Sequence, residues 1–492
     1  MAFVLIGFMG AGKSTVAARL AEQRGASPLD SDALLAERFG HSVAREFELH
    51  GEESFRADEE KLVRELLDDA SPRDVIALGG GSVLSGRVRE ALAGHLTVLL
   101  DVDPLLAWER IHTSEDGAER PLARDREAFL ALHSERSALY EELADAVLVW
   151  ASSASGEYPV LIGRGLLRAA GAATLEQLWP LDRSVSRPFL VTDETVAALY
   201  AERLREMSGV IAIAPGEDSK TLASAERVWR ELLAAGMTRA DHVVALGGGV
   251  VGDLAGFCAA AYQRGVPVVQ IPTTLVAQVD SAYGGKTGVD LPEAKNYVGV
   301  YHQPAGVLVD PDALATLPAA ELAAGWVEVL KTALIAGGPL WEEVAGGGEV
   351  DEDTILACVR TKLEIVAADE RDAGRRQVLN LGHTVGHAIE AATGYARYRH
   401  GEAVGLGLLA ALRLSGLDDL RAQVLELLLA RGLPVTLADA PVSVEEIVGA
   451  TAHDKKRVGA HVPFVLLDAP GAAIAGREVP DADLRSAVAE LF

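Results

Sequence analysis

Cysteine, basic side chains and long apolar runs are all scarce in this sequence. Two cysteines among 492 residues do not support a disulfide framework, so we expect a reducing, cytoplasmic location. Lys and Arg number 45 against 72 Asp and Glu, and the formal net charge of −27 argues against nucleic acid as a partner. No charge-free apolar run reaches about 18 residues, so we expect neither a transmembrane helix nor a membrane partner.

The apolar residues that are present follow two patterns along the chain. A length of 492 residues exceeds what one hydrophobic core usually supports, so two or three domains are expected. Short β-rich runs alternate with helical patterns as far as about residue 310, which predicts α/β folds with parallel sheets. Beyond about residue 310 helical periodicity dominates. The polar stretch WASSASGE, at residues 150–157, is typical of a linker. We predict a domain at 1–150, a linker at 151–157, an α/β domain at 158–315 and a mostly helical domain at 316–492.

Individual elements follow from the same patterns. The predicted strands are Val4–Ile6, Val75–Leu78, Val98–Leu100, Ala146–Val149, Tyr158–Ile162, Leu190–Val191, Ile211–Ala214, Val243–Leu246 and Val268–Ile271. The predicted helices of the last domain are Leu322–Ile335, Thr354–Ala368, Thr384–Ala392, Ala403–Ser415 and Leu420–Ala430.

The first chemical motif is a phosphate-binding loop. Residues 7–14 read GFMGAGKS and match GxxxxGKS between a predicted strand and a predicted helix. Backbone N–H groups would surround the phosphates of ATP, Lys13 would reach the β and γ oxygens, and Ser14 would ligate Mg²⁺. A glycine turn with a chance lysine is the alternative, and the strand–loop–helix context disfavours it. The predicted nucleotide-binding residues are Gly10, Ala11, Gly12, Lys13, Ser14 and Thr15.

Several shorter motifs follow the loop in a characteristic order. They are Asp30-Ser31-Asp32, Phe55-Arg56, Gly79-Gly80-Gly81, Arg120-Pro121-Leu122 and the segment from Arg136 to Tyr140. Residues 1–150 thereby resemble shikimate kinase. The resemblance implies that Asp30 supports Mg²⁺, that Asp32, Gly80 and Gly81 contact the substrate hydroxyls, and that Arg120 closes over ATP. It assigns the substrate carboxylate to Arg56 and Arg136, and a bidentate guanidinium suits that group.

The resemblance is incomplete at one place. The family usually adds a further helix after the strand predicted at Ala146–Val149, close to the nucleotide base, whereas this sequence continues directly into the polar stretch. A nucleotide-sensing or assembly module without phosphotransfer therefore stays open as an alternative for residues 1–150.

A second glycine-rich turn lies in the larger part of the chain. Gly247–Gly249 follows a predicted strand, and with Asp253 it suits a pyrophosphate at a helix N-terminus. The sequence PGEDSK at 215–220 also follows a predicted strand and suits contact with a ribose. These two turns are the parts of a dinucleotide site that the local pattern indicates.

Residues 158–492 resemble 3-dehydroquinate synthase throughout. The segments that carry this resemblance are GGGVVGDLAGFCAAAYQRG at 247–265, PTTLVAQVDSAYGGKTGVDLPEAKNYVG at 272–299, GWVEVLKTALI at 325–335, DERDAGRRQVLNLGHTVGHAIE at 369–390 and HGEAVGLG at 400–407. With these segments, the resemblance implies an NAD site that comprises Asp193, Glu217, Lys220, Gly248, Gly249, Val250, Asp253, Thr273, Thr274, Lys286 and Lys295. The role of Asp193 at the cofactor is implied by the resemblance alone.

A metal site is expected in the helical domain. Glu328 lies on a helical stretch, and His383 and His387 are four residues apart on one helical face. Two histidines with a carboxylate and one open position are typical of catalytic Zn²⁺. Spacing alone would pair His383 with His387. The resemblance instead implies that Glu328, His383 and His400 bind Zn²⁺ or Co²⁺, and that His387 acts near the leaving phosphate.

The resemblance also implies a site for an anionic sugar acid. Its members would be Arg264, Asp280, Lys286, Asn296, Lys331, Lys362, Arg376, Asn380, His387 and a terminal lysine, Lys456 in preference to Lys455. Of these, Asp280, Lys286, Lys331, Lys362, Arg376, Asn380 and His387 are the candidates for catalysis, as Lys13, Asp32 and Arg120 are in the kinase. Arg264 would reach across from a partner subunit, which implies a homodimer. Asp372 stands where the family usually has glutamate, so we expect its contact to be bridged by water.

The implied reaction is a redox-assisted elimination. NAD⁺ takes a hydride, phosphate leaves, the hydride returns, and the ring reopens and closes by an aldol step. The substrate would be 3-deoxy-arabino-heptulosonate 7-phosphate. Related cyclases that act on other sugar phosphates are the alternative, and the kinase fusion together with the lysine and arginine set favours the carboxylated substrate. Since the two activities are not consecutive in the aromatic pathway, direct channelling is not implied.

Overall fold

The computed structural model describes residues 1–492 except 24, 114–122, 169–170, 438–439 and 452–462. The chain forms two compact units. Unit 1 comprises Met1–Trp150, Pro159–Arg187 and Arg203–Arg205. Unit 2 comprises Ala151–Tyr158, Pro188–Glu202 and Glu206–Phe492. The segment 159–187 thus groups with unit 1, whereas the sequence pattern placed it with the second enzyme.

Unit 1 is built on a parallel sheet with the strand order β2-β3-β1-β4-β5. Its apolar strands are buried on both faces, as in α/β proteins. The strands are β1 (Phe3–Ile6), β2 (Pro28–Asp30), β3 (Val75–Ala77), β4 (Leu96–Leu100) and β5 (Ala146–Ser153). The helices are α1 (Lys13–Gln23), α2 (Ser31–Phe39), α3 (Val43–Asp68), α4 (Gly86–Leu92), α5 (Pro104–Thr113), α6 (Arg126–Leu143) and α7 (Ala172–Gln177). All the strands predicted for this region are present.

The region expected to be a linker is a β-hairpin. Strand β5 continues to Ser153, β6 spans Gly156–Ile162, and Ala154 and Ser155 form the turn between them. Of the predicted linker, residues 151–153 and 156–157 therefore lie in strands. Small polar side chains are common in tight turns as well as in linkers, and composition does not separate the two.

The first half of unit 2 contains a parallel run of strands, of order β13-β10-β9-β7-β8. Its strands are β7 (Pro188–Asp193), β8 (Gly209–Ile213), β9 (His242–Gly247), β10 (Val268–Pro272) and β13 (Gly306–Val309). The helices α8 (Glu194–Tyr200), α9 (Leu222–Ala234) and α10 (Gly249–Ala261) alternate with them, and β11 (Lys286–Leu291) and β12 (Ala294–Tyr301) form an antiparallel ribbon. Apolar side chains of β7, β9 and α10 share one core, which includes Phe189, Val243 and Leu254.

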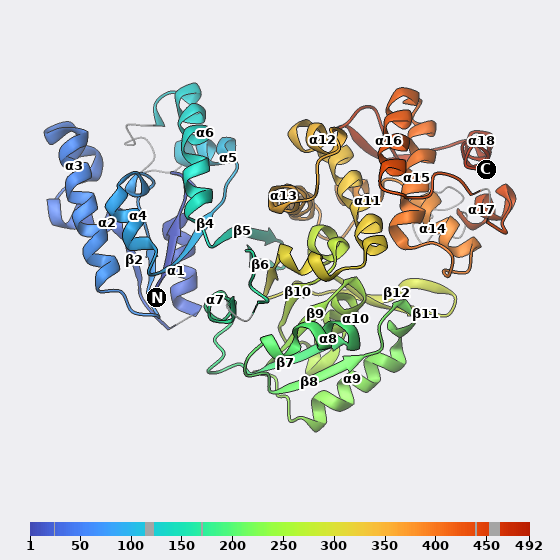
Figure 1. The fold of residues 1–492 in the computed structure, drawn as a ribbon, viewed down its shortest axis with the longest axis horizontal. Coiled ribbons are helices and arrows are strands. Elements are labelled where there is room, and N and C mark those ends of the chain that lie inside the picture. The colour runs from blue at the N-terminus through green and yellow to red at the C-terminus, as the bar shows by residue number, and fades with distance from the viewer. Residues whose placement is uncertain (24, 114–122, 169–170, 438–439, 452–462) are drawn as a thin grey trace. The chain divides into compact units, whose positions relative to one another are not determined.

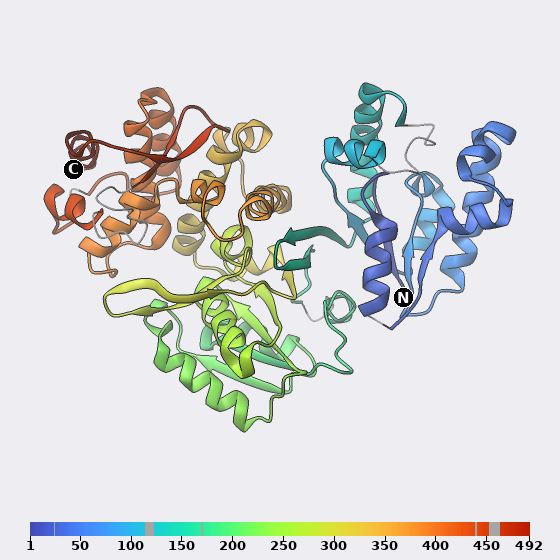
Figure 2. The same ribbon diagram turned by 180° about the vertical axis from the view of Figure 1, so that it is seen from behind.

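The second half of unit 2 is mostly helical, as predicted. Its helices are α11 (Ala319–Ala336), α12 (Gly338–Ala345), α13 (Glu352–Ala368), α14 (His383–Ala392), α15 (His400–Leu414), α16 (Asp418–Ala430), α17 (Val444–Thr451) and α18 (Asp481–Ala489). A small ribbon of β14 (Phe464–Leu467) and β15 (Ala473–Arg477) accompanies them. In Figures 1 and 2 this helical layer, yellow to red, lies beside the green sheet of the same unit.

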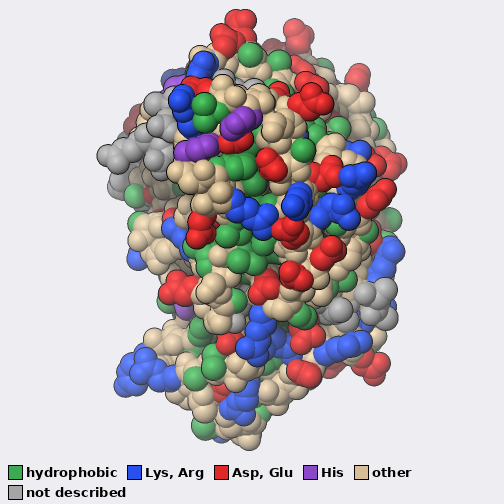
Figure 3. All heavy atoms as spheres, turned by 90° about the vertical axis from the view of Figure 1, so that its left-hand side faces the viewer, with side chains coloured by type: hydrophobic (Ala, Val, Ile, Leu, Met, Phe, Trp, Pro, Cys, Tyr) green, Lys and Arg blue, Asp and Glu red, His purple; other side chains and the backbone are tan. Residues whose placement is uncertain are grey.

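Figure 3 shows which kinds of side chain are exposed on one face of the molecule. On the face drawn in Figure 3, acidic and basic side chains are interspersed and hydrophobic side chains occur in small groups. Within the described ranges, no helix combines the length and the apolar character needed to span a bilayer.

Candidate functional site

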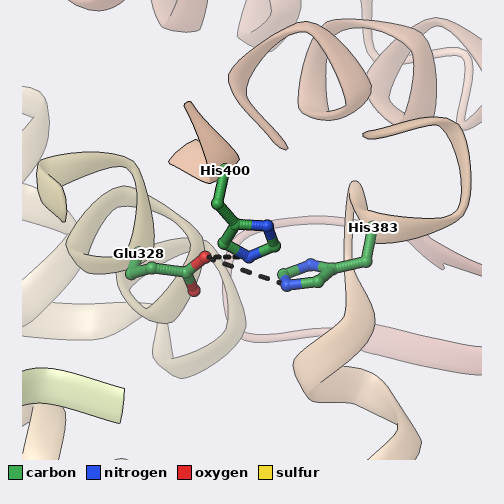
Figure 4. Close-up of side chains that lie close together, drawn as sticks. All are labelled: Glu328, His383 and His400. Atoms are coloured by element: carbon green, nitrogen blue, oxygen red, sulfur yellow. Dashed lines mark ion pairs between the residues drawn. The ribbon is translucent and has the colours of Figure 1, made fainter. Parts of the chain in front are cut away.

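Three helices of unit 2 bring one carboxylate and two imidazoles together (Figure 4). Glu328 of α11 places Oε1 3.4 Å from Nε2 of His400 and 3.8 Å from Nε2 of His383. The ligand atoms of the three residues all lie within 4.8 Å of one another. His383 and His400 are the first residues of α14 and α15. This donor set fits a catalytic Zn²⁺ or Co²⁺ ion with an open position.

Glycines allow the three helices to approach closely. A Cβ atom built on Gly401 of α15 would lie 1.8 Å from the carbonyl oxygen of Ala324 in α11. A Cβ atom on Gly407 would lie 2.0 Å from the carbonyl oxygen of Gly382, which precedes α14. Any larger residue at either position would push the helices apart, so both glycines help to set the distances between the three metal-binding side chains.

The charges around this cluster favour a cation. Burial opposes ionisation of Glu328, yet Lys331 and the two imidazoles hold the pKa of that carboxyl well below its usual range. Burial would lower the pKa of His400, but Glu328 and Glu390 raise it to about 10. The carbonyl of Leu381 lies 3.1 Å from Nδ1 of His383. A proton on Nδ1 donated to that carbonyl leaves the Nε2 lone pair directed at Glu328.

Glu390 is a site residue that the sequence reasoning missed. Its Oε2 lies 3.4 Å from Nδ1 of His400, and its Oε1 accepts a hydrogen bond of 3.1 Å from Lys295. Burial opposes ionisation of Glu390, but His400 and Lys295 lower its pKa to about 2. Together with His387 and His400, Glu390 forms a second cluster of possible ligand atoms. The signal was available, because Glu390 follows His383 by two helical turns on the same face.

A group of buried charges lies next to the metal cluster. Asp280, in a π-helical turn at Ala277–Ser281, forms ion pairs with Lys331 and Lys362, and Lys331 also pairs with Glu328. Burial raises the pKa of Asp280, but the two lysines lower it overall. Burial lowers the pKa of Lys362 to about 8 despite Asp280. The two lysines are paired with Asp280 and Glu328, and their ammonium groups are also the cations available here for an anionic ligand.

Arg376 and Asn380 come from one short helix, the 3₁₀ segment Arg375–Asn380. Arg376 is 1% exposed, and its guanidinium donates to the carbonyls of Glu370 at 2.6 Å and Gly284 at 2.9 Å. Asn380 donates to the carbonyl of Gln377 at 3.0 Å. The guanidinium of Arg376 is therefore fixed by main-chain acceptors.

Asp372 forms an ion pair with Lys286, while the expectation of a water-bridged contact at Asp372 stays a prediction. Its Oδ2 lies 2.5 Å from Nζ of Lys286. Lys286 is the first residue of β11, so this ion pair ties the ribbon to the loop before Arg376.

The predicted NAD residues lie where strands β7 to β10 end, except Lys286 and Lys295, which lie on the β11–β12 ribbon. Gly248 caps α10, and a Cβ atom there would lie 2.8 Å from a methyl group of Thr274. Lys220 is buried among Glu217, Asp253 and Asp290, with its Nζ 2.6 Å from Glu217. Burial raises the pKa of Asp253 to about 6. Carboxyl ends of parallel strands, a helix N-terminus and small residues fit a dinucleotide.

Other predicted cofactor and substrate residues make local contacts. Asp193 caps α8 by accepting a hydrogen bond from the amide of Val196 at 2.9 Å. Arg264 and Asn296 are exposed and have positive φ angles of 73° and 53°. Lys455, Lys456 and Arg120 lie outside the described residues.

The phosphate loop of unit 1 has the expected form. Gly7, Gly10 and Gly12 have positive φ angles, and Lys13 donates to the carbonyls of Gly7 at 2.8 Å and Phe8 at 3.0 Å. The hydroxyl of Ser14 donates to Asp30, which caps α2. The lysine and hydroxyl positions fit a Mg²⁺-nucleotide.

The other predicted kinase residues converge on the glycine turn after β3. Arg136 donates to the carbonyl of Gly80 at 3.5 Å, and a Cβ atom on Gly81 would lie 2.2 Å from the guanidinium of Arg56. Oδ1 of Asp32 lies similarly close to the position of a Cβ atom on Gly79. The structure therefore brings these residues together on one side of the phosphate loop. Glu59, which pairs with Arg56 at 2.5 Å, was not assigned from the sequence.

Comparison with protein families identifies the same two parts. Residues 9–158 match the family model of shikimate kinase, residues 210–324 that of the 3-dehydroquinate synthase N-terminal domain, and residues 325–457 that of its C-terminal domain. The 3-dehydroquinate synthase of Caulobacter vibrioides is 45% identical over 359 residues, which are 68% of this chain and 95% of that protein. The 3-dehydroquinate synthase of Brucella ovis is 42% identical over 364 residues, 69% of this chain and 95% of that protein.

Solved structures are similar over the larger part of the chain. The 2-epi-5-epi-valiolone synthase ValA of Streptomyces hygroscopicus subsp. jinggangensis 5008, with NAD⁺ and Zn²⁺ bound, has a TM-score of 0.61 and 28% identity, over 68% of this chain and 96% of that one. A 2-deoxy-scyllo-inosose synthase complexed with carbaglucose-6-phosphate, NAD⁺ and Co²⁺ has a TM-score of 0.61 and 23% identity. It covers 70% of this chain and 100% of its own, and its likeness concerns the fold.

Proposed function

The chain belongs to the 3-dehydroquinate synthase family and carries a shikimate kinase domain ahead of the synthase, and from this premise we propose which of its residues perform each reaction. The enzyme is bifunctional. It phosphorylates shikimate to shikimate 3-phosphate with ATP, and it converts 3-deoxy-arabino-heptulosonate 7-phosphate to 3-dehydroquinate with release of phosphate. The observation that carries the synthase assignment is the convergence of Glu328, His383 and His400 beside Asp280 and its lysines.

Two cofactors serve the synthase. Glu328, His383 and His400 would hold Zn²⁺ or Co²⁺, and the turn at Gly248 with the carboxyl ends of β7 to β10 would hold NAD. When bound, the metal polarises a substrate oxygen and NAD⁺ transiently accepts a hydride. The bound NAD⁺ with Zn²⁺ or Co²⁺ named for the two solved synthases supports this assignment.

The buried charges of the synthase bind and orient the substrate. Lys331, Lys362 and Arg376 lie in a region of low solvent access, where they attract carboxylate and phosphate groups strongly. Asp280 holds both lysines in place by ion pairs. His387 would move a proton at the leaving phosphate, and its ring centroid, 5.2 Å from that of His383, supports a role close to the metal cluster.

In the kinase, positioning and charge stabilisation account for most of the catalysis. Lys13 would contact the transferred phosphoryl group, while Ser14 and Asp30 would support Mg²⁺. Asp32 would accept the proton of the reacting hydroxyl, and Arg56 and Arg136 would hold the carboxylate. Arg120 keeps its predicted role as the residue that closes over ATP.

The homodimer and the cytoplasmic location are also part of this proposal. Arg264 lies exposed at a corner after α10, which suits a residue that reaches a neighbouring subunit. Both cysteines are buried and unpaired, as expected in a reducing compartment. Mixing an Arg264→Ala variant with a His383→Ala variant should restore some synthase activity if the arginine crosses the interface. No restoration at any mixing ratio would contradict a shared site.

NAD recycling provides the test of the synthase mechanism. Enzyme stripped of cofactor should require added NAD⁺ and release phosphate from the heptulosonate phosphate without accumulating NADH. NADH that builds up in proportion to the phosphate would indicate an ordinary dehydrogenase. Turnover of an uncarboxylated sugar phosphate in preference to the heptulosonate phosphate would favour a related cyclase instead.

A further inference from the structure

The turn of the β5–β6 hairpin contacts the residues that hold Arg376. The backbone amide of Ser155 donates to Oε2 of Glu370 at 3.1 Å, and the Ser155 hydroxyl donates to Oε1 of the same carboxylate. The phenolic oxygen of Tyr158, on β6, accepts a hydrogen bond of 3.3 Å from the amide of Gly284. Ser155 and Tyr158 thus attach to two segments that lie far apart in the sequence.

Glu370 and Gly284 are also the two residues whose carbonyls fix the guanidinium of Arg376. The hairpin therefore forms hydrogen bonds with the side chain of Glu370 and with the backbone amide of Gly284. A Cβ atom on Gly284 would lie 2.5 Å from a guanidinium nitrogen of Arg376, so only a glycine allows the guanidinium to approach the main chain this closely. The side-chain amide of Gln303 also donates a hydrogen bond of 2.9 Å to the Glu370 carboxylate.

We propose that Ser155 and Tyr158 are positioning residues for Arg376, so that the turn following the last kinase strand sets the substrate affinity of the synthase. This inference rests on the proposed role of Arg376 in substrate binding. The four bonded residues, Ser155, Tyr158, Glu370 and Gly284, all belong to unit 2, although β5 begins in unit 1. Burial raises the pKa of Tyr158 to about 12, so its hydroxyl stays neutral at the pH of an assay.

Tyr158→Phe and Ser155→Ala test the proposal, since each removes one hydroxyl and little volume. Ser155 is exposed, so its replacement does not threaten folding. We expect Tyr158→Phe, which removes one neutral hydrogen bond, to raise the KM for 3-deoxy-arabino-heptulosonate 7-phosphate by about fivefold, and Ser155→Ala, which removes a hydrogen bond to a carboxylate, to raise it at least as much. The kcat, the NAD affinity, the metal content and the shikimate kinase rate should stay within about twofold of the unaltered enzyme. Ser155→Thr, which keeps the hydroxyl, should restore the KM.

Ser152→Ala is the matched control, because Ser152 lies on the same hairpin and its hydroxyl contacts only the exposed Glu157 among the bonds described here.

A double-mutant cycle separates positioning from general structural support. In an Arg376→Lys background, Tyr158→Phe should no longer change the KM, since the guanidinium that it positions is gone.

Three results would overturn the proposal. The first is an unchanged KM in both single variants while the unaltered enzyme is active. The second is a parallel loss of kcat, thermal stability and KM, which indicates a purely structural role. The third is a full Tyr158→Phe effect in the Arg376→Lys background. Absence of synthase activity in the unaltered enzyme would instead contradict the proposed function.

Discussion

Oε1 of Glu328 lies 3.4 Å from Nε2 of His400, and this contact depends on the close approach of α11 and α15 at Gly401. Glu328 and His400 lie far apart in the sequence, on α11 and α15. His383 also lies close to Glu328, so the three predicted metal ligands come together at this contact. The metal assignment and its dependence on helix packing can be tested separately.

Removal of a metal ligand should differ from removal of its neighbour. His383→Ala and His400→Ala should lose bound metal and phosphate release together, because each supplies one of three donors. His387→Ala should retain the metal and lose about 100-fold in turnover, the usual effect of a proton-transfer group. Elemental analysis after dialysis measures the difference. Metal loss in His387→Ala together with metal retention in His400→Ala would show that the ligands are His383 and His387, the pair that spacing suggests.

Gly401→Ala should weaken metal binding without changing a donor. The added methyl group would lie 1.8 Å from the carbonyl of Ala324, so α11 and α15 must separate. Overpacking of this kind lowers stability by about 1–3 kcal/mol. Gly449→Ala in α17 is the control, since its methyl group would meet nothing within 4 Å. Thermal melting and Co²⁺ titration of both variants provide the comparison, and equal behaviour would refute a role for helix spacing.

The affinity of the synthase for its substrate should fall as the pH rises. Burial lowers the pKa of Lys362 to about 8, so this lysine carries its charge below that pH and loses it above. We expect the KM for the heptulosonate phosphate to rise roughly fivefold to tenfold from about pH 7 to about pH 9. Lys362→Arg keeps a permanent charge and should flatten this dependence, whatever its effect on kcat. A KM of the unaltered enzyme that stays constant across this range would contradict the charge assigned to Lys362.

The buried strands and the long helices could be predicted because burial leaves a strong pattern. Val243–Leu246 is a continuous apolar run, and it lies within β9 as expected of a strand covered on both faces. The segment 151–157 could not be interpreted from composition, since Ser155 and Gly156 suit a hairpin turn as well as a linker.

The site was only partly predictable, for a physical reason. Local spacing places His383 beside His387 on one helical face, whereas the contact with His400 depends on how α14 and α15 pack. The resemblance to the family supplied that contact, and the structure agrees with it. Neither source indicated that Glu370 and Gly284 hold Arg376, because main-chain carbonyls leave no signature in side-chain identity.

Assaying both reactions on one preparation, with one variant disabled in each site, tests the bifunctional account most directly. Lys13→Ala should abolish shikimate-dependent ADP release and leave phosphate release from the heptulosonate phosphate unchanged, because the loop that holds ATP lies in unit 1. His383→Ala should do the reverse. Nucleotide binding without shikimate-dependent ADP in the unaltered chain would contradict the account, and it would assign residues 1–150 to sensing or assembly.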